Sequence, residues 1–369
     1  MAVRRDIYII WYSMKKWLLC AIAVSVLTVS CKNESEQEIE STAESGVVLV
    51  QNQSYFELVL PNGNSLYFSQ FDEDGDVSGL AFEEDSVEVA VSYGTGFFVS
   101  TEGQIATNAH VVDNMVGDKA ANRSVKKVFD GMKAVLLQTY NEYKTKYSNA
   151  STLAMLWLYD DDVSASDYQA ACAVRDGYKE DMDECEQIYG AIDDFKANEC
   201  EIKYHNKVSV AYNNTFVTTA SDFIDCVVTE TDHEHDLAIV QLKDRKTPED
   251  RHVFAVPETD PLKEYSFTDK VKKMMGSDKN AQLYMLSFNL GPTLALTKEG
   301  IKSQFNNGSI SQKTADRLMY SIPALHGSSG SPVLNHEGEL VAVNYAGLNG
   351  TQGFNYGIRV KHLRALLGE

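Results

Sequence analysis

The stretch GSSGSPV at residues 327–333 decides the fold predicted for this chain, because it sets a serine between glycines just before a short apolar run. Two further stretches belong with it: IATNAHVV at residues 105–112 and HDLAIV at residues 235–240. Each is modest alone, since a histidine at a strand end or an aspartate before a strand is common. The order His110, Asp236, Ser329, with each residue in its own setting, is much harder to obtain by chance.

Together the three stretches resemble the trypsin-like peptidases of the chymotrypsin fold, in particular the bacterial HtrA/Deg-type and glutamyl-endopeptidase branches. The family's Thr-x-Ala-His signature matches residues 107–110, its Asp-Leu-Ala strand matches residues 236–238, and its Gly-x-Ser-Gly-Ser/Gly-Pro loop matches residues 327–332. The resemblance covers roughly residues 90–115 and 205–369. It implies a mainly β fold of two packed antiparallel β-barrels, and a serine endopeptidase that acts on proteins or peptides without a cofactor.

The resemblance also assigns roles to the catalytic residues. A serine hydroxyl is a weak nucleophile until a base takes its proton. His110 would be that base, and Asp236 would hold its imidazole in the right tautomer, with both residues in the first barrel and Ser329 in the second. The backbone amides of Gly327 and Ser329 would form the oxyanion hole, where losing one donor typically costs about 3–4 kcal/mol of transition-state stabilisation.

The substrate pocket is expected to be small and mostly apolar. Its wall is assigned by the same resemblance to Pro323, Ala324 and Leu325 before the nucleophile and to Asn344, Tyr345 and Ala346 on the following strand. No aspartate stands where a trypsin-like pocket binds lysine or arginine. Asn344 takes the place of the histidine with which glutamyl endopeptidases receive glutamate. We therefore expect small or aliphatic side chains before the scissile bond.

Short apolar runs separated by turn residues predict the strands. Residues 47–50, 56–60 and 87–91 have strand composition within a β-rich N-terminal extension expected over residues 47–90, and further strands follow from residue 207 onward. Many short strands favour a closed or sandwiched β architecture. The acidic run at residues 72–76 fails the calcium-loop pattern and is expected to be a solvated hairpin turn.

Residues 117–200 predict a helical hairpin inserted in the first barrel. Apolar side chains recur at spacings of three and four from Val125 to Tyr143 and again from Tyr178 to Phe195, as on amphipathic helices. Acidic residues crowd the second half of the insert. The plain interpretation is a solvated outer face. The sharper one is an element near the cleft that gates substrates or partners.

Length and charge exclude some classes of function. The chain has 369 residues and a formal net charge of −20, and so it is a poor candidate for nucleic-acid binding, which relies on lysine and arginine. The run from Asp232 to Asp236 contains two histidines and resembles a metal cluster. Because neighbouring residues on a strand point to opposite faces, we predict no metal site there.

The N-terminus predicts export. Lys15 and Lys16 precede a short apolar run that ends in small residues, which is typical of a secretory signal over residues 1–30. Met14 offers a second start, so the translation of residues 1–13 is left open. The end of the signal resembles a bacterial lipobox, which implies that Cys31 is lipidated and anchors the protein at the periplasmic face or cell surface. Residues 31–46 would then form an acidic tether.

Four cysteines follow the signal and the lipobox: Cys172, Cys185, Cys200 and Cys226. An even number in an oxidising compartment makes disulfides plausible, and four cysteines allow three connectivities. If Cys172 and Cys185 share one helix, they lie about 20 Å apart. That separation is too large for a bridge between them.

Two other functions fit the same scaffold, and the oligomeric state is open. A pseudoprotease would bind peptides in its cleft without cleaving them, but the intact set of His110, Asp236 and Ser329 argues against it. A chaperone-like quality-control protein, as among HtrA relatives, would carry a PDZ domain. Forty residues follow Ser329, enough only to finish the second barrel, so no C-terminal PDZ domain is expected.

Overall fold

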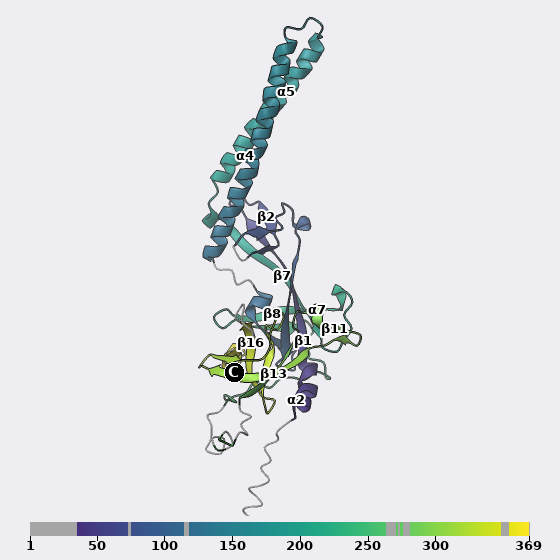
Figure 1. The fold of residues 1–369 in the computed structure, drawn as a ribbon, viewed down its shortest axis with the longest axis vertical. Coiled ribbons are helices and arrows are strands. Elements are labelled where there is room, and N and C mark those ends of the chain that lie inside the picture. The colour runs from purple at the N-terminus through teal and green to yellow at the C-terminus, as the bar shows by residue number, and fades with distance from the viewer. Residues whose placement is uncertain are drawn as a thin grey trace, which may run out of the picture.

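The computed structural model describes residues 35–72, 75–113, 118–262, 271, 274–275, 281–347 and 354–368. Two β-barrels lie at one end of the molecule, and a long helical hairpin projects away from them (Figure 1). The signal peptide predicted over residues 1–30 and the lipidation site predicted at Cys31 lie outside the described residues.

Six antiparallel strands form the first barrel. In spatial order they are β1 (Val47–Val59), β5 (Ala90–Phe98), β6 (Gln104–Thr107), β9 (Leu237–Leu242), β8 (Ile224–Asp232) and β7 (Glu201–Tyr212), and β7 pairs with β1 to close the ring. The start of β1 is apolar on both faces because Val48 and Val50 point into this barrel while Val47 and Leu49 point into the core shared with the second barrel.

The second barrel is also closed and antiparallel. Its strands, in spatial order, are β10 (Gln282–Ser287), β13 (Gln304–Lys313), β14 (Arg317–Tyr320), β17 (Asn355–Arg359), β16 (Leu340–Gly347) and β15 (Pro332–Asn335). Met285, Leu318 and Val341 fill its interior. Phe97 of the first barrel and Phe288 beyond β10 meet in the shared core. The predicted double antiparallel β-barrel is therefore confirmed.

Shorter elements connect and cover the barrels. They are β2 (Ser65–Phe68), β3 (Gln70–Phe71), β4 (Val77–Ser78), β11 (Leu296–Thr297), β12 (Gly300–Ile301), α3 (Ala109–Val112), α7 (Pro292–Ala295), α8 (Val360–Leu366), η2 (Glu84–Ser86), η3 (Ala197–Glu199) and η4 (Ala220–Asp222). The acidic run at residues 72–76 connects the paired strands β3 and β4, as expected of a hairpin turn, although residues 73–74 lie outside the described part.

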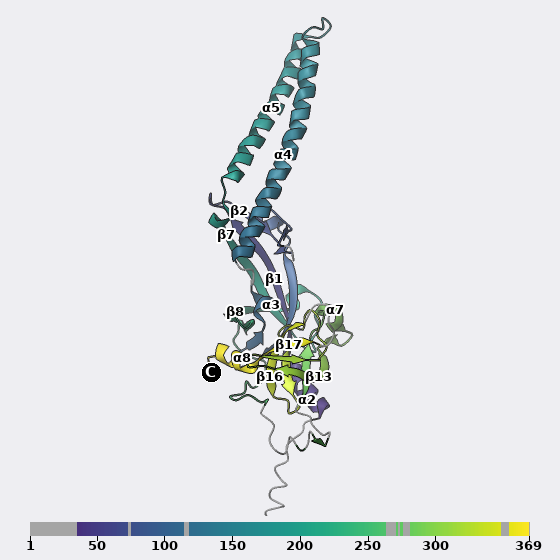
Figure 2. The same cartoon turned by 60° about the vertical axis from the view of Figure 1, so that its left-hand side comes forward.

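The helical insertion lies between β6 and β7, as predicted, and consists of α4 (Asp118–Trp157) and α5 (Ala165–Asp193). It stands on an arm formed by β1 and β7, which continue together past the barrel (Figure 2). Phe56 of the arm and Phe68 of β2 pack against Val125, Phe129 and Ile192 of the insert. Among the described helices, none combines the length and apolar composition needed to cross a bilayer.

The N-terminal segment differs from the prediction in two ways. Helix α2 (Glu36–Ala43) and the turn η1 (Glu44–Gly46) replace most of the acidic tether expected over residues 31–46. Ser35 begins α2 with a capping box, and Ile39 is buried in the shared core. The acidic composition suggested a tether, but the cap and one apolar face of the segment stabilise a helix. The expected extension over residues 47–90 is also wrong in part, because β1 is a strand of the first barrel.

The four described cysteines are free, contrary to the disulfides thought plausible. Cys172 and Cys185 share α5, where the helical rise keeps them apart as expected. Cys226 lies on β8 in the first barrel core, and burial raises the pKa of its thiol to about 12.

We expect the burial of His252 to make the folded protein less stable at acidic pH. Its ring packs edge-on against Phe254 at 4.7 Å, and burial lowers its pKa below the ordinary value of 6.5. The folded state thus favours the neutral ring, so this contribution is complete above about pH 6.5 and is lost as pH falls through the lowered pKa. We expect the difference between the urea midpoints measured at pH 7 and at pH 5 to be smaller in the His252→Gln variant than in the natural protein. An unchanged pH dependence in the variant would contradict this.

Candidate active site

His110 and Asp236 meet at one end of the first barrel. His110 lies on the short helix α3 after β6, and Asp236 occupies the tight turn before β9. His110 Nδ1 lies 2.7 Å from Asp236 Oδ2, and the His110 backbone N–H donates to Asp236 Oδ1 at 2.9 Å. Asp236 has φ +53°, a conformation that aspartate tolerates better than most residues, and Asn108 Nδ2 holds its carbonyl at 2.8 Å.

Two glycines shape the loop that contains Ser329, and any residue with a side chain would be strained at either position. Gly327 has φ +92° and Gly330 has φ +87°. A Cβ on Gly327 would lie 2.4 Å from the Phe288 carbonyl oxygen, and one on Gly330 would lie 2.1 Å from the Thr95 carbonyl oxygen. Such close backbone approach requires the missing side chain. Gly330 therefore lets the loop lie close to the first barrel, and Gly327 lets it lie close to the segment that follows β10 in the second.

Strand β5 joins the two halves of the site. The Thr95 backbone N–H donates to the Ser329 carbonyl oxygen at 2.8 Å, and the Thr95 hydroxyl donates to the Gly327 carbonyl oxygen at 2.7 Å. Val111, next to His110, packs against Gly94. The Ser329 hydroxyl donates to the Tyr345 carbonyl oxygen at 3.5 Å, and within the described part of the chain no hydrogen bond joins it to His110.

The backbone amides predicted for the oxyanion hole are available. Ser328 N–H donates to the Leu325 carbonyl oxygen at 2.9 Å and Ser331 N–H to the Ser328 carbonyl oxygen at 3.1 Å. In contrast, the N–H groups of Gly327 and Ser329 have no hydrogen-bond acceptor among the described residues. Two such donors on one loop can stabilise the charge that develops on a carbonyl oxygen.

The six residues predicted for the substrate wall do not all serve that purpose. Pro323 and Leu325 are exposed, Ala324 and Tyr345 are half-buried, and Ala346 lies on β16 with its side chain outside the description. Asn344 differs from the expectation because its side chain is buried and faces away from the surface. Its side chain is 1% exposed, accepts a hydrogen bond from the Tyr320 hydroxyl at 2.7 Å and donates to the Ser328 carbonyl oxygen at 2.9 Å. Asn344 therefore holds the Ser329 loop in place through Ser328.

The sequence did not predict the contacts of His235 that support the turn containing Asp236. The His235 ring stacks on the ring of His362 in α8 at 3.7 Å, and its Nδ1 lies 2.7 Å from Asp232 Oδ2. The run that resembled a metal cluster thus builds a turn, and no group of three or more metal-binding side chains occurs in the described ranges. No local sequence pattern predicts the stacking of His235 on His362, because the two residues are far apart in the chain.

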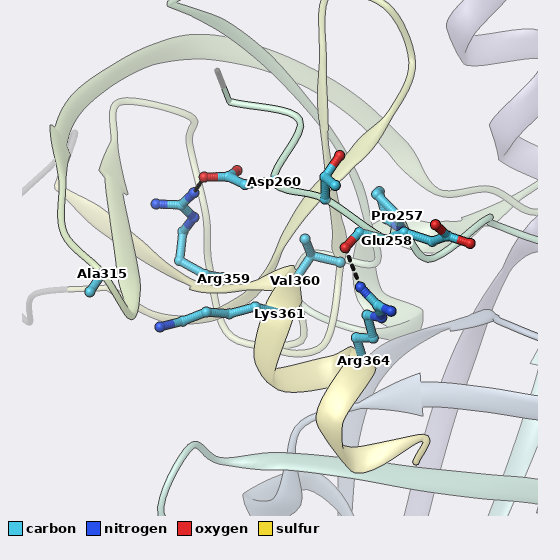
Figure 3. A pocket seen from close by; sticks show the side chains of 9 residues that line it. Pro257, Glu258, Asp260, Ala315, Arg359, Val360, Lys361 and Arg364 are labelled. Carbon is cyan, nitrogen blue, oxygen red and sulfur yellow. Dashed lines mark hydrogen bonds and ion pairs between the residues drawn. The ribbon is translucent and has the colours of Figure 1, made fainter. Parts of the chain in front are cut away.

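Ion pairs and hydrogen bonds hold α8 in place for that stack. Figure 3 shows Arg359, at the start of the helix, turned toward the Asp260 carboxylate, and Arg364 turned toward the Glu258 carbonyl oxygen. Leu363 on the same helix is fully buried in the shared core. The last helix of the second barrel is therefore fastened beside the turn that carries Asp236.

Two comparisons with known proteins found similarity to peptidases. Residues 195–343 match the family described as "Trypsin-like peptidase domain", a range that includes Asp236 and Ser329. This match supports a trypsin-like peptidase. The serine endoprotease from Yersinia pestis is a similar solved structure, at 12% sequence identity and a TM-score of 0.42, with 91% of this chain and 66% of that chain covered. No curated protein matched the sequence.

Proposed function

We propose that this protein is a serine endopeptidase that hydrolyses peptide bonds of proteins through His110, Asp236 and Ser329. One observation carries the proposal: His110 Nδ1 and Asp236 Oδ2 lie 2.7 Å apart, at the junction where strand β5 holds the Ser329 loop. A base oriented by a carboxylate, next to a glycine-flanked serine, is the arrangement that nucleophilic acyl transfer requires. The peptidase-family match supports the same reaction class.

In this mechanism the Ser329 hydroxyl first turns from the Tyr345 carbonyl toward His110 Nε2. His110 takes the proton as the oxygen attacks the scissile carbonyl carbon, and Asp236 stabilises the imidazolium that forms. The amides of Gly327 and Ser329 bind the oxyanion. When the C–N bond breaks, His110 gives its proton to the leaving amine, and the acyl group stays on Ser329. Water then attacks the ester by the same route.

The substrates proposed are proteins with a small or aliphatic residue before the scissile bond. Leu325 and Tyr345 place largely apolar side chains near Ser329, and the Asn344 side chain turns inward to the Tyr320 hydroxyl instead of facing the substrate. Export and lipidation at Cys31 belong to the same proposal. They rest on the sequence of residues 1–31 alone.

Covalent labelling tests the proposal. A fluorophosphonate probe should form one adduct, on Ser329, with loss of fluoride, because only an oriented base makes a serine hydroxyl reactive enough. Peptide mass spectrometry should find no adduct after Ser329→Ala. The matched control is Ser331→Ala, which removes a buried neighbouring hydroxyl and should label as the natural protein does. A natural protein that stays unlabelled would favour a peptide-binding protein without catalysis.

A further inference from the structure

A second recess lies beside His110, on the side of the first barrel. It has a volume of about 230 Å³. Among the residues that line it are Phe56, Phe71, Ser92, His110, Asp113 and Tyr204. Its lining residues come from β1, β5 and β7, from the segment of β2 and β3, and from α3 and the residue after it, whereas the wall proposed for the residue before the scissile bond belongs to the second barrel.

The recess exists because β1 changes its partner along one edge. Strand β5 pairs with β1 as far as Ala90 opposite Ser54, and β2 takes the same edge from Phe68 opposite Phe56. The two partner strands are not paired with each other, and the Ser69 hydroxyl just after β2 donates to the Glu88 carbonyl oxygen just before β5. Aromatic rings close its floor, where the Phe56 ring lies 4.9 Å from that of Phe71.

The position of the recess relative to the scissile bond follows from proton transfer. His110 must stand over the leaving nitrogen to protonate it, so the leaving part of the substrate passes His110 on the side away from the second-barrel wall. Strand β5 lies on that side, joined to the nucleophile loop through Thr95 N–H and the Ser329 carbonyl oxygen. Backbone groups of alternate residues point the same way on a strand, so Val91 and Tyr93 turn theirs to the passing chain.

We propose that this recess binds a large apolar side chain of the substrate's leaving segment, within the first three residues after the scissile bond. The inference rests on the proposed function. An extended peptide advances about 3.3 Å per residue, so three residues reach roughly 10 Å past His110. The aromatic floor suits an apolar or aromatic side chain. Asp113, paired with His233 at 3.2 Å, is the acidic residue of the lining and disfavours an acidic side chain.

The experiment compares two substrates with the same residues before the scissile bond. One ends in p-nitroanilide and has no leaving peptide. The other is an internally quenched peptide with four residues after the bond, in versions that place Phe or Asp at the first, second or third of them. The variant is Ser92→Arg, which puts a long side chain from an exposed strand position into the recess. Its matched control is Ser166→Arg, at an exposed position at the start of α5, and the hairpin of α4 and α5 projects away from the barrels (Figure 1).

The measured quantity is the ratio of kcat/KM for the extended substrate to that for the anilide. In the natural protein we expect Phe to exceed Asp at one position by at least tenfold, and Ser92→Arg to remove that preference while Ser166→Arg keeps it. An unchanged preference in Ser92→Arg overturns the inference, and so does an equal loss on both substrates. Anilide hydrolysis in the natural protein separates these results from a failure of the proposed function, since absence of all hydrolysis overturns both.

Discussion

Replacing Asp236 by asparagine is expected to lower kcat by about 10⁴-fold without unfolding the protein. The reason lies in two contacts. The His110 backbone N–H donates to Oδ1, which will select the amide orientation that leaves oxygen at this position. The new amide nitrogen then faces His110 Nδ1, where the carboxylate oxygen stood at 2.7 Å. It can only donate, so the ring proton moves to Nε2, and Nε2 can no longer accept the proton of Ser329.

Steady-state hydrolysis of a peptide anilide and the rate of fluorophosphonate labelling would measure this loss, with circular dichroism to check folding. Asp244→Asn is the control, because Asp244 is exposed and bears the same change of charge away from His110. It should retain the natural rates. If Asp236→Asn kept more than a tenth of the natural activity, Asp236 would not be the residue that orients the base.

Gly330→Ala is expected to destabilise the fold by about 3 kcal/mol or more and to abolish hydrolysis. The added Cβ would lie 2.1 Å from the Thr95 carbonyl oxygen and 2.4 Å from the Thr107 hydroxyl oxygen, both in the wall of the first barrel. A φ of +87° adds strain for any residue with a side chain. Since overpacking alone costs about 1–3 kcal/mol, the two costs together should push the nucleophile loop away from β5.

Urea unfolding would measure the change, with Gly177→Ala as the matched control. Gly177 lies inside α5, and a Cβ added there would meet nothing within 4 Å beyond the backbone of its own helix. Alanine at this position should therefore stabilise the protein by about 0.5–1 kcal/mol. Opposite signs for the same chemical change would locate the effect in the site. A neutral Gly330→Ala would mean that the loop does not need its close approach to β5.

The family resemblance carried by three motifs predicted the double barrel, and the apolar spacing predicted the hairpin because that spacing is repeated many times along residues 117–200. The stripe from Val125 to Tyr143 lies on α4, and the stripe that begins at Tyr178 lies on α5 as far as Ile192, with Phe195 just beyond the helix end. The fate of single side chains was harder to predict. Asn344 was expected in the substrate wall, but the Tyr320 hydroxyl draws its side chain inward, and that partner comes from another strand.

The segment before β1 shows the same limit. Glutamates dominate residues 36–44, so composition predicted a tether, yet Ile39 and Ala43 on one side of α2 are enough to dock it on the shared core. Likewise, the contact of His110 with Asp236 was implied by the family resemblance, whereas the stack of His235 on His362 depends on how the second barrel returns to the first. Contacts of that kind are set by tertiary packing and leave no local trace.

The unbroken pairing of β1 with β7 has a mechanical consequence. The two strands are hydrogen-bonded from Val48 opposite Tyr212, inside the barrel, to Val59 opposite Glu201, at the foot of the hairpin. Such a ladder is rigid, because bending it strains many hydrogen bonds at once. A force applied at the far end of α4 and α5 is therefore transmitted along β1 and β7 into the first barrel, where the short helix α3 carries His110.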